Sequence, residues 1–534
     1  MKKKIAITAL LVVCFAVQSV FACFITGVGR LATADGSTMT SHTCDSASDD
    51  LRLWLIPSMA EGTEREVVVD GRKDADFTNF PQVKDYGARG IVMDTYTNDK
   101  DTYQYLHAMY SFANEKGLTM NESTCGWTKT QREVLAAYEG IWDCYMLQDA
   151  ALENCATAEE AVVFMGDKIT QQGWNGWPEC ICIADGTDVW VFEAYGGNMW
   201  CAFKLPDDAF FFCANRCRID FWEEDGATYR SAPNMKEFAI ANNLWNGEGD
   251  FRPCQVFAAG NYSFNCVGRE WRVLVTLPSD YTEAVIGKDE LAYCETPDDT
   301  FPLYYTPYEK VSVSTIARIC SDNYEGTKYD GTKSAYAGMH GNVLSVPYQY
   351  RPTNVPQCTY FQISNVKAWL PEEARCLVWF GWGAPSTTYL TPVFASQTEL
   401  APHFGRGTRY EYDPQSGWWN EALVQTAATL NYADAIEVIK SVRDPRMEAQ
   451  FEATFAVQNK AAKMIKNGQR DEAIDMLTKY ANDQATMWFN LYGELSEQLV
   501  ARYVVGRVNM KSSPALHADW WKEVVTAVSN VVVE

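Results

Sequence analysis

Histidine is scarce in this sequence, and cysteine pairs with Cys-x-x-Cys spacing are missing. The 534-residue chain holds five histidines, scattered along its length, and none of its 17 cysteines forms a Cys-x-x-Cys pair. Structural zinc sites are built from closely spaced pairs of cysteine and histidine ligands. We therefore expect no metal site and no other cofactor.

Long apolar runs are absent after the first 22 residues, and basic residues are outnumbered. A membrane-spanning helix needs about 20 consecutive apolar residues, so we expect no integral span.

The chain has 45 Lys and Arg against 69 Asp and Glu, a formal net charge of −24. Such an acidic chain is a poor partner for nucleic acid or an anionic membrane surface. Its length exceeds what one simple core supports, so two or more substructures are expected.

The first 22 residues are typical of a secretory signal peptide. Lys2, Lys3 and Lys4 form a positive start, and an apolar stretch follows up to Val20. Val20 and Ala22 supply the small residues that a signal peptidase requires before its cleavage site. We therefore expect export to the periplasm, the extracellular space or the cell surface.

Cleavage after Ala22 would make Cys23 the first residue of the mature chain. A terminal amine has a reference pKa of about 7.7–8.0 and a thiol about 8.5, close enough to exchange a proton near neutral pH. A nucleophile and a general base would then share one residue. Two other interpretations stay open: Cys23 could be the lipid-modified cysteine of a lipoprotein, or an ordinary structural cysteine.

The residues after Cys23 predict a β-hairpin. Strands are expected over residues 23–30 and 38–44, with Asp35-Gly36 at the turn, because Asp-Gly tolerates positive φ. This hairpin returns Asp45 towards the chain start and so places a carboxylate near the new amine; alternatively, Asp45 is a surface turn residue. Gly27-Val-Gly29 superficially matches a dinucleotide fingerprint, but a turn follows it rather than a helix.

Further elements follow from periodicity and turn signals. Helices are expected over residues 132–145 and 157–165, an antiparallel meander over 180–214, and strands near 341–350, 358–364 and 374–382. Asp444-Pro445 predicts the start of a helix that ends at Asn467-Gly468, and another helix pattern covers 471–504. We expect a core over residues 23–414, with residues 415–534 forming a helical region packed on it.

Several short motifs, in order along the chain, carry a family resemblance. They are the Cys23 start, Asp35–Met39, Asn114–Leu118, Ile183–Asp185 with Val189 and Glu193, Leu205–Asp208, Ala214–Ile219, Gly268–Arg272 and Trp382–Ser386. Together they resemble the C69 family of dipeptidases, N-terminal-nucleophile hydrolases related to penicillin V acylase and bile salt hydrolase. The resemblance covers residues 23 to about 394. It implies an α+β fold, an αββα four-layer sandwich of two antiparallel sheets between helical layers.

The resemblance also assigns catalytic roles. Cys23 would be the nucleophile, Asp45 would orient the α-amine, Asn215 would donate to the oxyanion, and Arg269 would supply positive charge that favours the thiolate. Outside the family context, Asn215 is an ordinary capping or turn residue and Arg269 a surface charge on a strand.

Two positions depart from the pattern of the related acylases. An acylase arginine three residues before the aspartate is replaced by His42, and an acylase asparagine is replaced by Ser123-Thr124. We keep His42, Ser123 and Thr124 as candidates for substrate contact.

The resemblance implies an exported cysteine-type dipeptidase that cleaves dipeptides through a thioester. A homo-oligomeric state stays open. Two alternatives stay open. The chain could be an acylase that cleaves N-acyl amides, or a lipid-anchored binding protein that has lost catalysis. The chemical state of Cys23 discriminates between catalysis and binding, because an acylated amine cannot act as a base.

We predict that the exported protein begins at Cys23 with a free amine, because Val20 and Ala22 satisfy the cleavage rule. Intact-mass measurement and N-terminal sequencing of the exported protein test this expectation. A different first residue, or a diacylglycerol group on Cys23, would contradict it.

Overall fold

The computed structural model describes residues 23–46, 49–69, 91–138, 140–260, 263–282, 301–344, 350–409 and 411–511, together with a few residues between 520 and 526. Among these residues, no helix is both long and apolar enough to cross a membrane. The signal-peptide segment expected over residues 1–22 lies outside the described residues.

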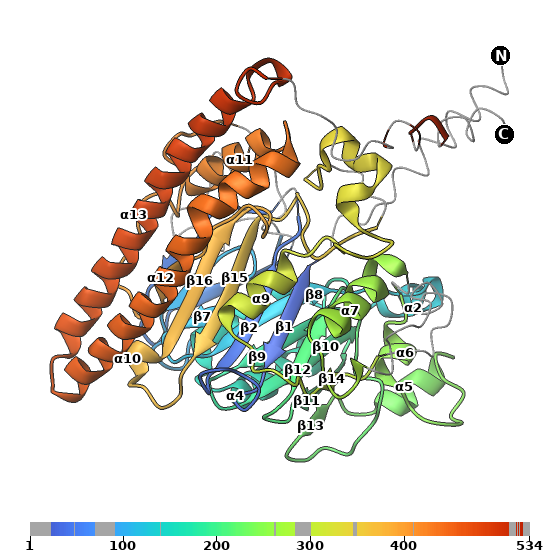
Figure 1. Ribbon diagram of the computed structural model, residues 1–534. Helices are drawn as coiled ribbons and strands as arrows, with labels where there is room; N and C mark the ends of the chain where they lie inside the picture. Colours follow the sequence, from blue (N-terminus) through green and yellow to red (C-terminus); the bar gives the residue numbers. More distant parts are fainter. Residues whose placement is uncertain are drawn as a thin grey trace.

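Two large antiparallel sheets form the centre of the molecule (Figure 1). The first sheet has seven strands in the spatial order β14 (Tyr304–Tyr305), β12 (Phe210–Cys213), β1 (Phe24–Val28), β2 (Thr38–Thr43), β15 (Tyr360–Val366), β16 (Cys376–Trp382) and β17 (Thr391–Phe394). The second has eight, in the order β13 (Tyr229–Ser231), β11 (Met199–Lys204), β10 (Val189–Gly196), β9 (Glu179–Ala184), β8 (Thr119–Thr124), β7 (Ala113–Asn114), β6 (Tyr105–His107) and β3 (Trp54–Ile56). A separate ribbon pairs β4 (Glu64–Val69) with β5 (Ile91–Thr97).

The two sheets pack face to face through their central strands. Strands β1 and β2 contact β8 and β9 across the interface. All residues of these four strands are buried, although β2 and β8 consist mostly of polar residues. The core therefore lies between the sheets, and the start of β1 lies within it.

Helices cover the outer faces of both sheets. Those shorter than 20 residues are α2 (Lys129–Leu135), α3 (Cys144–Asn154), α4 (Ala158–Gln172), α5 (Met235–Ala241), α6 (Pro253–Phe257), α7 (Phe264–Thr276), α9 (Val313–Cys320), α10 (Glu372–Arg375) and α11 (Gly417–Ala428). Helix α4 packs on β9, β10 and β11 of the second sheet, and α9 packs on β15 of the first. The α+β architecture is thus the four-layer αββα sandwich that the family resemblance implies.

Two long helices, α12 (Tyr432–Lys466) and α13 (Arg470–Arg502), pack against each other along the side of the first sheet (Figure 1). The expected helix start at Asp444-Pro445 is wrong, because Pro445 lies inside α12. An interior proline costs a helix about 3 kcal/mol, and buried side chains on either side, such as Ile439 and Ala461, offset that cost. The expected end at Asn467-Gly468 is confirmed, with Gly468 at a φ of 84°.

The helix expected over residues 132–145 is wrong and is replaced by two helices, α2 and α3. Between them the backbone of Gly140 lies so close to Gly173 that a Cβ atom would be 2.3 Å from the Gly173 carbonyl carbon. Asp143 then caps the new helix by accepting a hydrogen bond from the Met146 N–H at 3.0 Å. Local helical periodicity does not reveal this close backbone approach.

The expected meander over residues 180–214 is correct for β9, β10 and β11 and wrong for its last strand. Strand β12 leaves the second sheet and pairs with β1 and β14 of the first. The crossing carries Asn215, which follows β12, to the start of β1. No strand forms over the described residues 341–344, and residues 345–349 lie outside the described part.

The N-terminal hairpin forms, but its register differs from the expected one. A symmetric turn at Asp35-Gly36 would place residue 23 opposite residue 48, whereas Phe24 pairs with Thr43. The register shifts because the segment between β1 and β2 is longer than a two-residue turn. Its N–H groups at Gly29 and Leu31 donate to the carbonyls of Ala209 and Asp207 instead of pairing across the hairpin. Asp45 consequently follows β2 at the end nearest Cys23.

Gly27 permits the close approach of the two sheets, and we predict that Gly27→Ala destabilises the fold. A Cβ atom at this position would lie 2.4 Å from the Cys182 sulfur and 3.2 Å from a Val189 methyl carbon in the opposite sheet. Overpacking of this kind costs about 1–3 kcal/mol. Chemical denaturation of the variant measures the loss; Gly226→Ala is the control, because its Cβ would meet nothing closer than 3.7 Å. Equal unfolding free energies for the two variants would contradict the expectation.

Candidate active site

Cys23 lies immediately before β1 in the packed centre of the molecule and is 3% exposed. Its thiol donates to Oε1 of Glu122, on β8 of the opposite sheet, at 3.2 Å. Its backbone carbonyl accepts hydrogen bonds from Arg269 Nη1 at 3.1 Å and from the Ser123 hydroxyl at 3.4 Å. The residue is thus fixed at both its thiol and its carbonyl.

Arg269 lies on helix α7 and its side chain is buried. It is therefore not the surface charge on a strand that the alternative interpretation expects. Its guanidinium also donates to Asn215 Oδ1 at 2.7 Å, to the Ala214 carbonyl at 3.2 Å and to the Asn265 carbonyl at 2.6 Å. It therefore joins the first strand, the segment after β12 and its own helix around one charge.

Burial has the largest effect on the pKa of the Cys23 thiol in the full-length chain. Burial raises the pKa of the Cys23 thiol well above its ordinary value, and a hydrogen bond with Cys44 and the charge of Glu122 act in the same direction. In this chain the Cys23 nitrogen belongs to a peptide bond, so the α-amine is not yet available as a base.

Asp45 follows β2 and is also buried. Its Oδ2 atom accepts a hydrogen bond from Arg351 Nη2 at 3.0 Å, whereas its buried Oδ1 atom has no hydrogen-bond partner among the described residues. Burial raises the pKa of Asp45 to about 6, against the lowering effect of the charges of Arg351 and Arg269.

Asn215 has a left-handed backbone conformation with a φ of 65°, which asparagine tolerates better than most residues. Its side-chain nitrogen donates to the Thr124 carbonyl at 2.9 Å and, less closely, to the Ser123 hydroxyl at 3.3 Å. The sequence-based assignment requires one of these N–H groups to turn towards an oxyanion. The longer hydrogen bond, to Ser123, is the one more easily replaced by a hydrogen bond to an oxyanion.

The remaining three candidates also lie in this cluster. The Ser123 hydroxyl accepts a hydrogen bond from the Asn215 backbone N–H at 3.0 Å, and the Thr124 hydroxyl donates to Glu122 Oε2 at 3.3 Å. His42 is fully buried, with Nε2 3.4 Å from Glu122 Oε1 and Nδ1 3.3 Å from the Tyr360 hydroxyl. Every site residue named from the sequence is therefore brought to one place.

Three acidic or basic residues of the cluster were not found from the sequence: Glu122, Arg351 and Glu179. Glu122 sits inside a strand whose other residues are all uncharged, an unusual place for a carboxylate that could have signalled a function. Arg351 and Glu179 carry no such local signal, since both depend on chain segments that meet only in the fold.

The structure groups three possible metal donors that the sequence does not place together. Cys23 Sγ and one ligand atom each from His42 and Glu122 all lie within 4.8 Å of one another, the one such group among the described residues. These three side chains could hold a metal ion, but one of them is the candidate nucleophile.

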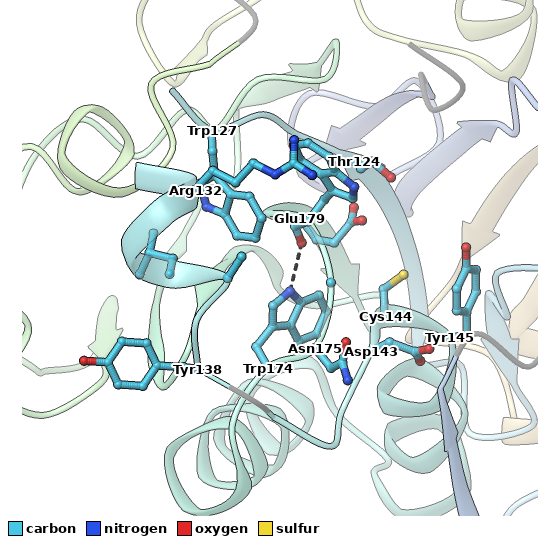
Figure 2. Close-up of a pocket in the computed structure, with 14 residues that line it drawn as sticks. Thr124, Trp127, Arg132, Tyr138, Asp143, Cys144, Tyr145, Trp174, Asn175 and Glu179 are labelled. Carbon is cyan, nitrogen blue, oxygen red and sulfur yellow. Dashed lines mark hydrogen bonds between the residues drawn. The ribbon is translucent and has the colours of Figure 1, made fainter. Parts of the chain in front are cut away.

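A pocket of about 320 Å³ lies beside this cluster (Figure 2). Thr124 and Glu179 line it at the side towards Glu122, and its other walls include Trp127, Trp174 and Trp177. The rings of Trp127 and Trp177 lie 5.3 Å apart, and the Arg132 guanidinium stacks 4.9 Å above Trp177. Burial, followed by the charge of Glu122, raises the pKa of Glu179 well above its ordinary value.

The four-layer sandwich, with a buried cysteine at the start of its first strand, has the architecture of N-terminal-nucleophile hydrolases. The model of one family, peptidase family C69, matches residues 22–444. The chain belongs to peptidase family C69.

The chain is similar to several proteins that carry dipeptidase names and, more distantly, to one solved structure. The chain is 25% identical over 418 residues to a probable dipeptidase of Salmonella dublin, covering 76% of this chain and 88% of that protein. It is 24% identical over 356 residues to probable dipeptidase B of Lactococcus lactis, covering 66% and 70%. A dipeptidase of Bifidobacterium longum is 22% identical over 429 residues, covering 76% of each. A mutant of the conjugated bile acid hydrolase from Clostridium perfringens aligns over 70% of this chain and 95% of its own, with 10% identity and a TM-score of 0.26.

Proposed function

We propose that this protein is an exported dipeptidase that acts through Cys23 as an N-terminal nucleophile once residues 1–22 have been removed. The observation that carries the proposal is the surroundings of Cys23: a thiol, a carboxylate, an asparagine amide and two arginines meet in the packed core. Burial of so many polar groups is costly and is found where chemistry requires it. The dipeptidase names of the relatives supply the substrate class.

Removal of residues 1–22 would create the base that the full-length chain lacks. The new α-amine would lie on Cys23 itself, close to its own thiol. Asp45 could then hold the protonated amine through Oδ1, which has no partner among the described residues. A positive charge at this point would also lower the pKa of the thiol and favour the thiolate.

The reaction then follows from the position of these groups. The α-amine takes the thiol proton, and sulfur attacks the carbonyl carbon of the peptide bond. Asn215 donates to the oxyanion, an interaction worth about 3–4 kcal/mol of barrier in other hydrolases. The ammonium protonates the leaving amine, and the free amine then activates the water that hydrolyses the thioester.

Arg269 acts in this scheme as a positioning residue. It holds the Cys23 carbonyl and the Asn215 side-chain oxygen, so the Asn215 amide is fixed beside Cys23 with its N–H groups towards Ser123 and Thr124. The same bonds fix the start of β1 once the preceding peptide is cut.

We predict that Cys23→Ser lowers kcat on dipeptides by orders of magnitude in correctly processed protein. Serine keeps a hydroxyl beside the same amine, but its pKa is far above that of a thiol, which closes the thiolate route. Steady-state kinetics of the processed variant measure the effect. Cys376→Ser is the matched control, because Cys376 is as buried as Cys23, at 3% exposed, but pairs with Val366 at the other end of the first sheet. A processed and folded Cys23→Ser protein with wild-type kcat would refute the nucleophile assignment.

We also predict that Arg351→Gln moves the acid limb of the kcat/KM profile to higher pH. The scheme needs Asp45 ionised, its pKa is about 6, and the charge of Arg351 lowers that pKa. Loss of this charge raises the pKa, so activity is lost at a higher pH as the solution is acidified. Arg470→Gln, on an exposed ion pair with Glu373, is the control. An unmoved limb, or one displaced to lower pH, would exclude Asp45 as the group that titrates.

A further inference from the structure

Two carboxyl groups beside the candidate nucleophile lack a basic partner. Glu122 is fully buried and Glu179 is 3% exposed. No Lys or Arg of the described chain forms an ion pair with either of them, and the contact of Glu122 with His42 is charged only when the histidine is protonated. Buried carboxylates are normally paired with a cation. Glu122 and Glu179 could therefore bind a cation that comes from a ligand and not from the protein.

The strand register places both carboxyl groups on one face of the second sheet. Thr124 lies directly opposite Glu179 in the pairing of β8 with β9, and Glu122 precedes Thr124 by two residues. Alternation along a strand puts all three side chains on the same face, and the hydrogen bond from the Thr124 hydroxyl to Glu122 agrees with this.

Glu179 connects the nucleophile to the pocket. It lines the pocket together with Thr124, and its buried Oε2 atom has no hydrogen-bond partner among the described residues (Figure 2). At the other side of Thr124, Glu122 Oε1 lies 3.2 Å from the Cys23 sulfur. The two carboxyls also hydrogen-bond to each other, so a ligand cation that replaced the shared proton would lie next to the attacking atom.

We propose that Glu179, together with Glu122, binds the free α-ammonium group of the substrate, and that the aromatic pocket takes the side chain of the same residue. This inference rests on the proposed function. In a dipeptide, the ammonium nitrogen and the side chain share the Cα next to the only peptide carbonyl. Binding that Cα through both groups would bring the carbonyl carbon to Cys23. The site would then select peptides with an unblocked amino terminus and an apolar or aromatic first residue, and would reject N-acyl amides.

The subsite is tested by substrate pairs that differ only at the amino terminus. Mature enzyme is assayed with phenylalanyl-alanine and its N-acetyl derivative, and with other Xaa-Ala pairs of the same design. Wild-type kcat/KM should favour the free amine by at least about 100-fold, because a charged hydrogen-bonding partner left empty is heavily penalised. Glu179→Gln keeps the size of the side chain but loses its charge. It should lower kcat/KM for the free dipeptides by about 10- to 100-fold, mainly through KM, and leave the N-acetyl substrates unchanged.

Glu133→Gln is the matched control. Glu133 lies on α2, whose residues also border the pocket, but its side chain is 65% exposed and pairs with Lys129 at the surface. This variant should behave as wild type on both substrate classes. A Glu179→Gln enzyme that loses activity equally on free and N-acetyl substrates would show a merely structural role and overturn the inference. A wild-type enzyme without preference would do the same.

Binding to the inactive Cys23→Ala variant separates this inference from the proposed function. Calorimetry should show that phenylalanyl-alanine binds at least about 10-fold more tightly than its N-acetyl derivative, a difference that Glu179→Gln in the same background removes. If mature wild-type enzyme cleaves neither class, the proposed function fails, while this preference in binding still supports the subsite. Equal binding of the two compounds overturns the subsite, even in an active dipeptidase.

Discussion

The buried guanidinium of Arg269 is the interaction on which the arrangement of the site depends. One charge on α7 holds the carbonyl of Cys23, the carbonyl of Ala214 and the side chain of Asn215. These groups come from segments almost 200 residues apart that meet only because β12 crosses from the meander to the first sheet. Loss of the guanidinium would remove a hydrogen-bond donor from each of these buried acceptors, and any acceptor left unsatisfied costs about 1–3 kcal/mol. The same interactions that position the candidate nucleophile, Cys23, therefore also stabilise the core.

The packing of the two sheets explains why the site can be both rigid and polar. Cys23 and Asp45 come from the first sheet, whereas Glu122, Ser123 and Glu179 come from the second. Each sheet alone would expose its polar groups to water, where hydrogen bonds and charges contribute little. Contact between the sheets, close enough that Gly27 meets Cys182, removes that water. The same burial that raises the pKa of Asp45 and of the Cys23 thiol makes each remaining interaction with a charge stronger.

Elements with a local sequence signal could be predicted. Features that depend on contacts between distant segments could not. The hairpin after Cys23 and the meander of β9, β10 and β11 have local strand and turn signals, so these elements could be predicted. The register of the hairpin could not, because distant backbone carbonyls at Asp207 and Ala209 determine it. The path of β12 is likewise invisible, since its Phe-rich sequence suits either sheet. Arg351 and Glu179 are single charged residues without a motif, and only the tertiary structure brings them to Cys23.

The balance of charge within the site connects these observations. Arg269 and Arg351 provide the fixed positive charges, and their bonds are directed to backbone carbonyls, Asn215 and one oxygen of Asp45. The second oxygen of Asp45 and the carboxyls of Glu122 and Glu179 receive no Lys or Arg among the described residues. These carboxyl groups could pair with two further cations. The proposed reaction supplies two: the α-ammonium of processed Cys23 and the α-ammonium of the substrate. If the substrate carried an N-acyl group in place of its α-ammonium, a buried carboxyl would be left without a cationic partner. This cost favours a peptidase over an acylase.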